Sequence, residues 1–210
     1  MEKQRTNPKG KIMSGEECRY FIRQYSFATL ITSDLKISHI PFILSDDDVI
    51  ETHLDSTNKQ LKSLENELCL LSILGPHALI STTNYVIKPA VPTWNYASVS
   101  IKGRGSLMSD EQLVTSLDKM LDYFQPDLKN DNVTLPDEFR AKLMQGITGV
   151  QIEVIEIQGK LKLGQERKIE DQLRIFEMFS GSSLGDMLYA QFARQWLERF
   201  RPIILNSKLK

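Results

Sequence analysis

Residues 75–96 read GPHALISTTNYVIKPAVPTWNY, and this stretch joins two segments whose composition is typical of β-strands. Before it, residues 67–74 form an apolar run that predicts a strand buried on both faces. Gly75-Pro76 is expected to break that strand, with an extended path resuming beyond it. Residues 84–91 are expected to form a loop, and residues 97–107 the next strand. The stretch therefore predicts two strands joined by a loop.

The N-terminal side of this stretch predicts a helix and then a meander of strands. Residues 14–24 have a helical period, and Ser14 with Glu17 fits a capping box at their start. Ser56-Thr57-Asn58 opens a short helix over residues 59–65. Between these helices lie three segments rich in β-branched and apolar residues, which predict antiparallel strands: 27–32, 36–44 and 49–54.

Helical patterns dominate the C-terminal side, where one further strand is expected over residues 147–157. Residues 184–200 form an amphipathic pattern with apolar residues four apart: Leu188, Phe192, Trp196 and Phe200. Three other helices are expected, at residues 109–124, 136–144 and 168–179. Five or six antiparallel strands with inserted and appended helices predict a mainly β, α+β fold built on a small barrel. Alternating βαβ units are not indicated, so a Rossmann domain is not expected.

Composition and segment lengths narrow the class of protein. The expected organisation is a polar segment over 1–13, a barrel domain over 14–180, and a C-terminal amphipathic helix over 181–210 that packs on the barrel or on a dimer partner. A formal net charge of −1 over 210 residues argues against a general nucleic-acid binder. We expect no secretory signal and no membrane span, because apolar runs are short. With Cys18 and Cys69 isolated in sequence, these features predict a cytoplasmic protein.

Two motifs carry a resemblance to a known family. GPHALIS at residues 75–81 and VPTWNY at residues 91–96 resemble the GPHAYIS and VPTWNY motifs of the PaiB-like family of FMN-binding negative transcriptional regulators. The likeness runs from about Glu16 to Met178, and looser similarities lie at 38–41, 52–54, 58–60 and 162–165. The resemblance implies an FMN-binding split β-barrel that works as a homodimer, with the flavin where two subunits meet. It also implies a regulatory role, with DNA or another regulatory partner.

FMN makes two demands on a protein, and the sequence offers candidates for each. Its phosphate needs cations, hydroxyls and N–H groups, and its ring needs an apolar or aromatic wall with a few fixed hydrogen bonds. The candidates for the phosphate lie at a strand end and a helix start: Thr52, Ser56, Thr57, Asn58 and Lys59. His53 and Gln60, beside them, are further cofactor-binding candidates. The candidates for the ring are Ser81, Thr82, Trp94, Asn95 and Tyr96. Lys102 and Arg104 are further cations on the strand that follows.

Each of these groups also has a purely structural interpretation. Ser56 to Asn58 can be a helix cap, and a histidine such as His53 on a strand is more often part of a core than a ligand. Trp94 and Tyr96 can be core aromatics, although the amide and hydroxyl groups beside them are costly to bury without partners.

Three functions stay open from the sequence. The first is a flavin-binding regulatory protein, and the second is a flavin-dependent oxidoreductase of the flavin reductase or pyridoxamine-phosphate oxidase type. The third is a barrel that has lost flavin and serves binding or assembly, since Ser98-Val99-Ser100 stands where the family commonly has a histidine. The sequence predicts no metal site, no catalytic set of side chains and no helix-turn-helix. Any redox chemistry would therefore belong to the cofactor.

Overall fold

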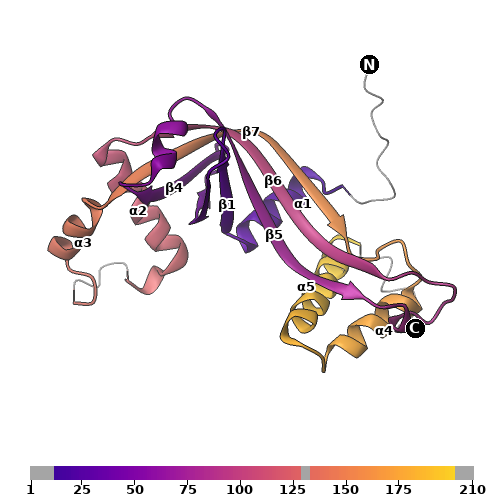
Figure 1. Ribbon diagram of the computed structural model, residues 1–210. Coiled ribbons are helices and arrows are strands. Elements are labelled where there is room, and N and C mark those ends of the chain that lie inside the picture. The colour runs from indigo at the N-terminus through magenta and orange to yellow at the C-terminus, as the bar shows by residue number, and fades with distance from the viewer. Residues whose placement is uncertain (1–11, 129–132, 202–210) are drawn as a thin grey trace, which may run out of the picture. The chain divides into compact units, whose positions relative to one another are not determined.

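A computed structural model describes residues 12–128 and 133–201 of the chain (Figure 1). The chain divides into two compact units. Unit 1 comprises Met1–Cys18, Leu74–Val99 and Gln158–Lys210, and unit 2 comprises Arg19–Ile73 and Ser100–Ile157. Three long strands contribute residues to both units: β5 (Leu68–Ile80), β6 (Thr93–Leu107) and β7 (Ile147–Lys162).

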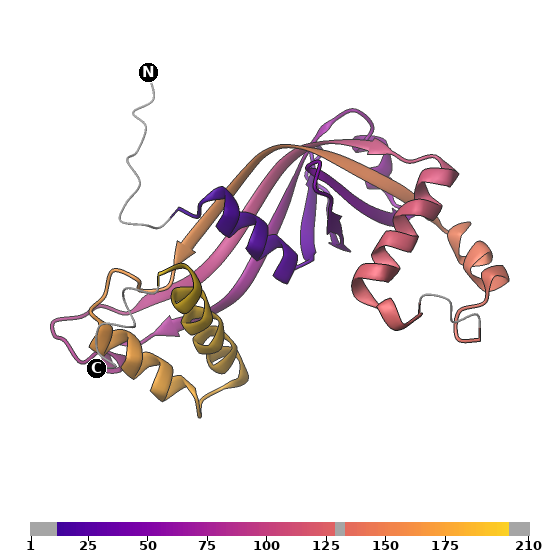
Figure 2. The ribbon, with the colours of Figure 1, turned by 180° about the vertical axis from the view of Figure 1, so that it is seen from behind.

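The remaining elements are short strands and helices, which Figures 1 and 2 show from opposite sides. The other strands are β1 (Phe27–Thr32), β2 (Ile37–Pro41), β3 (Ile43–Leu44) and β4 (Val49–Asp55). The α-helices are α1 (Gly15–Gln24), α2 (Asp110–Phe124), α3 (Asp137–Met144), α4 (Ile169–Phe179) and α5 (Leu184–Phe200). Three short 3-10 helices complete the described elements: η1 (Lys59–Ser63), η2 (Thr82–Asn84) and η3 (Pro126–Leu128).

The strands form an antiparallel sheet that must curl on itself in unit 2. Its order is β2-β1-β5-β6-β7-β4-β3, so β2 and β3 lie at opposite ends. These two strands are nevertheless separated in the chain by Phe42 alone. The hydroxyl of Thr52 on β4 donates to the carbonyl of Pro41 on β2 at 2.6 Å, which joins the two ends. This closure confirms the predicted α+β fold with a split β-barrel.

The inside of the barrel is mainly apolar, and η1 contributes the buried polar side chain of Gln60. Leu30, Ile50, Leu71 and Ile152, from four different strands, are each at most 1% exposed. Leu64, directly after η1, is fully buried. A Cβ on Gly105 of β6 would lie 2.6 Å from the Leu64 carbonyl oxygen, so the close approach of η1 requires glycine there.

Unit 1 is built on the ends of the long strands and on helices α4 and α5. Along α5 the buried residues recur with the helical period: Tyr189, Ala190, Phe192, Ala193, Trp196 and Leu197. The predicted stripe was therefore wrong at its first position, because Leu188 is 48% exposed and Tyr189 faces inward instead. The predicted helices at 14–24 and 168–179 are confirmed as α1 and α4, and the Ser14–Glu17 capping box is present.

Several predicted strand boundaries were wrong. β5 runs without interruption through Gly75-Pro76, and β6 already begins at Thr93. Within the described pairing, β1 contacts β5 only along Cys69–Ser72. Proline has no N–H to pair and is tolerated at a strand edge, so Pro76 does not end the strand. Two further differences are that residues 36–44 form two strands broken at Phe42, and that β7 continues to Lys162.

Candidate functional site

The predicted flavin-binding residues fall into two groups that belong to different units. One group lies in unit 2, on β4, on η1 and in the turn between them: Thr52, His53, Ser56, Asn58, Lys59 and Gln60. Ser81, Thr82, Trp94, Asn95 and Tyr96 lie in unit 1, around the loop between β5 and β6.

Gln60 of η1 is hydrogen-bonded to β1, to β2 and to the turn between these strands. It is 1% exposed, and its amide nitrogen donates to the Lys36 carbonyl at 2.9 Å and lies 3.3 Å from the Thr32 hydroxyl. Its amide oxygen accepts from the Ser38 hydroxyl. Asn58 caps η1 by accepting from the Gln60 N–H at 2.9 Å, and its amide donates to Ser38 at 3.0 Å. These partners give both side chains a structural role.

The start of η1 has fewer free hydrogen-bond donors for an anion than its sequence predicts. The N–H of Thr57 donates to the Asp55 carboxylate at 2.7 Å, and the N–H of Ser56 donates to the Gly146 carbonyl at 2.9 Å. An anion near this turn would also meet the charge of Asp55. The hydroxyl of Ser56 is already paired with the Thr148 hydroxyl at 3.1 Å, whereas the ammonium of Lys59 is on an exposed residue, so Lys59 remains the candidate for a phosphate.

Thr52 and His53 point to opposite sides of β4. The hydroxyl of Thr52 is used inside the barrel, where the residue is 1% exposed. His53 is half-buried, and its Nδ1 is a buried atom that no described residue hydrogen-bonds. Burial lowers the pKa of His53, because the cationic form loses hydration. His53 is therefore held neutral at neutral pH.

In unit 1, the residues of the β5–β6 loop bind mainly to one another. Ser81 accepts from the Thr83 N–H at 3.3 Å, and the buried Asn84 accepts from the Ser81 N–H at 2.7 Å, which makes a capping box on η2. The carbonyl of Thr82 accepts from the Lys88 ammonium. The loop is also held by Asp171 of α4, which is 1% exposed and whose Oδ1 accepts two backbone N–H groups, from Val86 at 2.8 Å and Ile87 at 3.0 Å.

The Trp94-Asn95-Tyr96 segment alternates between the two faces of β6. Asn95 is 1% exposed, and its amide donates to the Tyr189 hydroxyl of α5 at 2.9 Å. Tyr189 in turn donates to the Leu163 carbonyl at 3.1 Å. Trp94 is 50% exposed, and its indole N–H donates to Nδ1 of His77 at 3.2 Å, while Tyr96 is half-buried. Asn95 is thus a structural residue, and Trp94 is the one of the three that presents most surface to a ligand.

One surface of unit 2 combines exposed apolar groups with cations, and we call it the outer face. On β1, β2 and β5 the cross-strand neighbours Ile37, Ile31 and Leu70 form an apolar row. Ile37 is 60% exposed and Phe27, further along β1, is 61% exposed. On β6, which lies next to β5, the exposed residues Lys102 and Arg104 alternate with buried glycines and so lie on the same side of the sheet.

Three further groups escaped sequence reasoning. A pocket of about 240 Å³ in unit 2 is lined by Glu51, Glu111, Gln112, Thr115, Lys119 and Gln151. The buried bonds of Asp171 and Tyr189 are also absent from the predictions. A charged residue inside an apolar strand pattern, as at Glu51, was a signal, since such a side chain needs a partner. Asp171 and Tyr189 gave no signal, because their partners are distant in sequence.

The described residues contain no group of three or more histidine, cysteine or acidic side chains that could hold a metal ion. In the same part of the chain, none of the helices is long and apolar enough to cross a membrane.

Comparison with known proteins identifies a family match over most of the chain. Residues 6–156 match a family model described as "Putative FMN-binding domain". The "Protease synthase and sporulation protein PAI 2" of Bacillus subtilis is 33% identical over 178 residues, which cover 80% of this chain and 84% of that protein.

Two solved structures share the fold at low sequence identity. The flavocytochrome Anf3 from Azotobacter vinelandii has a TM-score of 0.53 and 18% identity, over 76% of this chain and 74% of that one. The FAD and heme binding protein from Mycobacterium smegmatis has a TM-score of 0.54 and 14% identity, over 72% of this chain and 73% of that one. These similarities show a shared fold.

Proposed function

The chain belongs to the FMN-binding domain family that includes PaiB-type proteins, and we propose that it is an FMN-dependent regulatory protein that binds its flavin on the outer face of unit 2. The main observation in support of this proposal is that apolar side chains and cations lie together on that face. When bound, FMN supplies redox chemistry through its ring.

The donor set of the outer face fits FMN. A flavin phosphate carries negative charge and needs cations, which Lys102 and Arg104 provide from exposed positions on β6. Lys59, exposed at the start of η1, is a third cation of the same unit. The ring needs an apolar surface, which Leu70 and Phe27 provide. In this proposal, the lysines and the arginine hold the phosphate and the apolar row excludes water from one side of the ring.

The outer face also supports a homodimer. Exposed apolar side chains gathered on one sheet surface are typical of a protein interface rather than of a surface that stays in water. The row of Ile37, Ile31 and Leu70 spans three neighbouring strands, with Leu68 beside it at 38% exposure. We propose that a second copy of the chain covers this row and completes the flavin site at the subunit interface.

The regulatory part of the proposal comes from the sporulation protein of Bacillus subtilis, a relative named for a role in protease synthesis and sporulation. Both cysteines of the chain are buried free thiols, which is compatible with a reducing, cytoplasmic setting. The regulatory partner, DNA or protein, would act through the dimer.

FMN titration tests the cofactor site. Quenching of flavin fluorescence by the wild-type protein should saturate, and Lys102→Ala combined with Arg104→Ala should weaken FMN binding by about tenfold or more, because charge-assisted hydrogen bonds contribute about 1.5–3 kcal/mol. Lys59→Ala should also weaken it. The same variants should bind riboflavin, which lacks the phosphate, as the wild type does. Lys160→Ala, which removes an exposed lysine in unit 1, is the control.

Several outcomes would count against the proposal. A protein that binds neither flavin would be a barrel that has lost its cofactor, and equal losses for FMN and riboflavin would remove these cations from the phosphate site. Bleaching of bound flavin by NADH or NADPH would favour an oxidoreductase. A salt-sensitive shift of promoter DNA would favour direct regulation.

Light scattering after size exclusion tests the dimer. Ile37→Lys places a charge in the apolar row and should convert a dimer into a monomer. Leu143→Lys, at a residue of α3 that is 54% exposed, is the matched control and should leave the mass unchanged. A monomeric wild type would refute the shared flavin site.

A further inference from the structure

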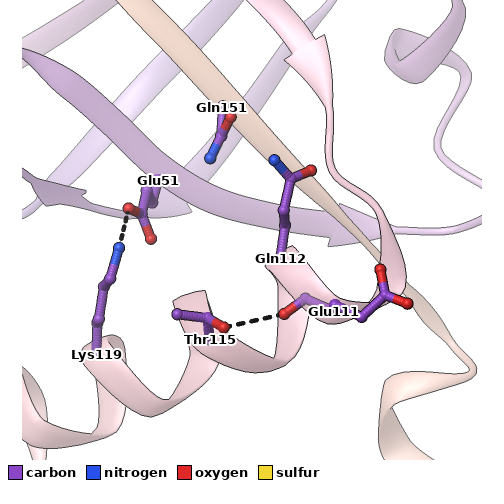
Figure 3. A pocket seen from close by; sticks show the side chains of 6 residues that line it. All are labelled: Glu51, Glu111, Gln112, Thr115, Lys119 and Gln151. Atoms are coloured by element: carbon purple, nitrogen blue, oxygen red, sulfur yellow. Dashed lines mark hydrogen bonds and ion pairs between the residues drawn. The ribbon is translucent and has the colours of Figure 1, made fainter.

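Unit 2 contains a second candidate binding site, formed by α2 over strands β4 and β7 (Figure 3). Its volume of about 240 Å³ lies below the range of roughly 300–1,000 Å³ for drug-sized ligands. The pocket is therefore too small for a flavin ring system and has the size for a ligand of a few heavy atoms.

Glu51 is the residue that gives this pocket a chemical character. Its side chain is 5% exposed, and Oε1 accepts from the Lys119 ammonium at 2.6 Å. The second oxygen, Oε2, is buried without a hydrogen-bond partner among the described residues. A buried carboxylate oxygen without a donor is costly, because it has lost its hydration. Figure 3 shows this carboxylate at the edge of the space between β4 and α2.

The other lining groups are polar and come from both sides of the pocket. Gln151 on β7 is the cross-strand neighbour of Glu51. Gln112 uses its amide oxygen to accept from the Ser109 N–H at 2.8 Å, and Figure 3 shows Gln112 and Gln151 directed toward the same space. Thr115 donates to the Glu111 carbonyl at 3.0 Å. The pocket thus presents amide groups around one carboxylate oxygen.

The charge balance of the lining favours a cation. Glu51 and Glu111 are negative and Lys119 is positive, so the lining carries one net negative charge. A ligand that brings both a positive charge and N–H donors would neutralise that charge and satisfy Oε2 of Glu51. We propose that this pocket binds a small ligand through a primary ammonium group, which donates to Glu51, and that it is separate from the flavin site.

The proposal is tested with butylammonium chloride, followed by NMR of the side-chain amides of Gln112 and Gln151. These signals should shift and saturate at millimolar concentration in the wild type. Tetramethylammonium chloride, which has charge but no N–H donor, and sodium butyrate, which has the opposite charge, should give no saturable shift. The experiment needs no flavin, so its result is independent of FMN binding.

Variants locate the binding at Glu51. Glu51→Gln keeps the shape and removes the charge, so it should weaken butylammonium binding tenfold or more, whereas Glu111→Gln at an exposed residue should change it less than threefold. If Glu51→Gln fails to fold, Thr115→Leu provides a second test, because a larger apolar side chain on the exposed face of α2 should fill the pocket and abolish binding. No saturable shift in the wild type, an equal response to tetramethylammonium, or unchanged binding in Thr115→Leu would each overturn the proposal.

Discussion

Removal of the Tyr189 hydroxyl is expected to destabilise unit 1 strongly. This residue is fully buried, and its hydroxyl accepts from the Asn95 amide at 2.9 Å and donates to the Leu163 carbonyl at 3.1 Å. Burial raises the pKa of Tyr189, so the hydroxyl stays protonated and able to donate. In Tyr189→Phe, the Asn95 amide group and the Leu163 carbonyl group would stay buried after losing this partner.

The expected loss of stability in Tyr189→Phe follows from these two polar groups that lose their partner. A buried polar group left without its partner costs about 1–3 kcal/mol, and two such groups give about 2–4 kcal/mol after partial relaxation. The matched control is Tyr123→Phe in unit 2. Tyr123 is 46% exposed, and its hydroxyl also has two partners, the Arg23 carbonyl at 2.7 Å and the Ser26 hydroxyl at 3.1 Å. Water can replace the lost hydroxyl there, so we expect a loss of about 0.5–1 kcal/mol.

Urea unfolding can measure the two units separately. Both tryptophans of the chain, Trp94 and Trp196, lie in unit 1, so fluorescence reports on that unit while far-UV circular dichroism reports on both. Tyr189→Phe should lower the urea midpoint of the fluorescence transition. Tyr123→Phe should leave that transition in place. Equal losses in the two variants, or a loss below about 1 kcal/mol for Tyr189→Phe, would refute the argument that burial sets the cost.

Three further predictions concern other buried groups. Asp171→Ala should destabilise unit 1 by about 2–4 kcal/mol because two backbone N–H groups lose a buried acceptor, and Asp171→Asn should cost about 1 kcal/mol because its amide oxygen still accepts; urea unfolding distinguishes them. The pKa of folded His53 is lowered from 6.5, so as the pH falls the unfolded chain binds a proton at this residue before the folded chain does. The stabilisation that this residue contributes is therefore complete above pH 6.5 and is lost as the pH falls through the folded-state pKa. In His53→Gln this part of the pH dependence of the thermal midpoint should disappear. Burial raises the pKa of Cys18 and of Cys69 to about 11, so neither thiol should react with a thiol reagent at pH 8 until the protein is unfolded, and rapid native labelling would contradict their burial.

The sequence predicted most of the elements because their signals are local. The capping box of α1 and the period of α4 depend on residues within one or two turns, and both elements are present. The Gly75-Pro76 break failed for a non-local reason. Proline ends a strand only where a neighbouring strand requires a backbone N–H at that position. The pairing of β1 with β5 stops at Ser72, so β1 requires no N–H from Pro76.

The candidate site was less predictable, because a polar residue gains its role from partners far along the chain. Gln60 is a polar residue of the kind that binds ligands, yet its side-chain amide donates to the carbonyl of Lys36, 24 residues away in the sequence. Glu51 lies in a strand pattern that predicts burial, but its pairing with Lys119 spans 68 residues. Only the fold decides which of these amides and carboxylates has a group left for a ligand.

The VPTWNY motif contains a residue, Asn95, whose contacts stabilise the fold and do not depend on a cofactor. Asn95 within it is buried and needs a partner, which α5 supplies through Tyr189. The family match ends at residue 156, so this partner lies outside the matched region. The loop before the motif is held in the same way by Asp171, also outside that region. Substitutions at Asn95 should therefore lower stability in the absence of flavin, whereas substitutions at Lys102 should affect FMN affinity at unchanged stability.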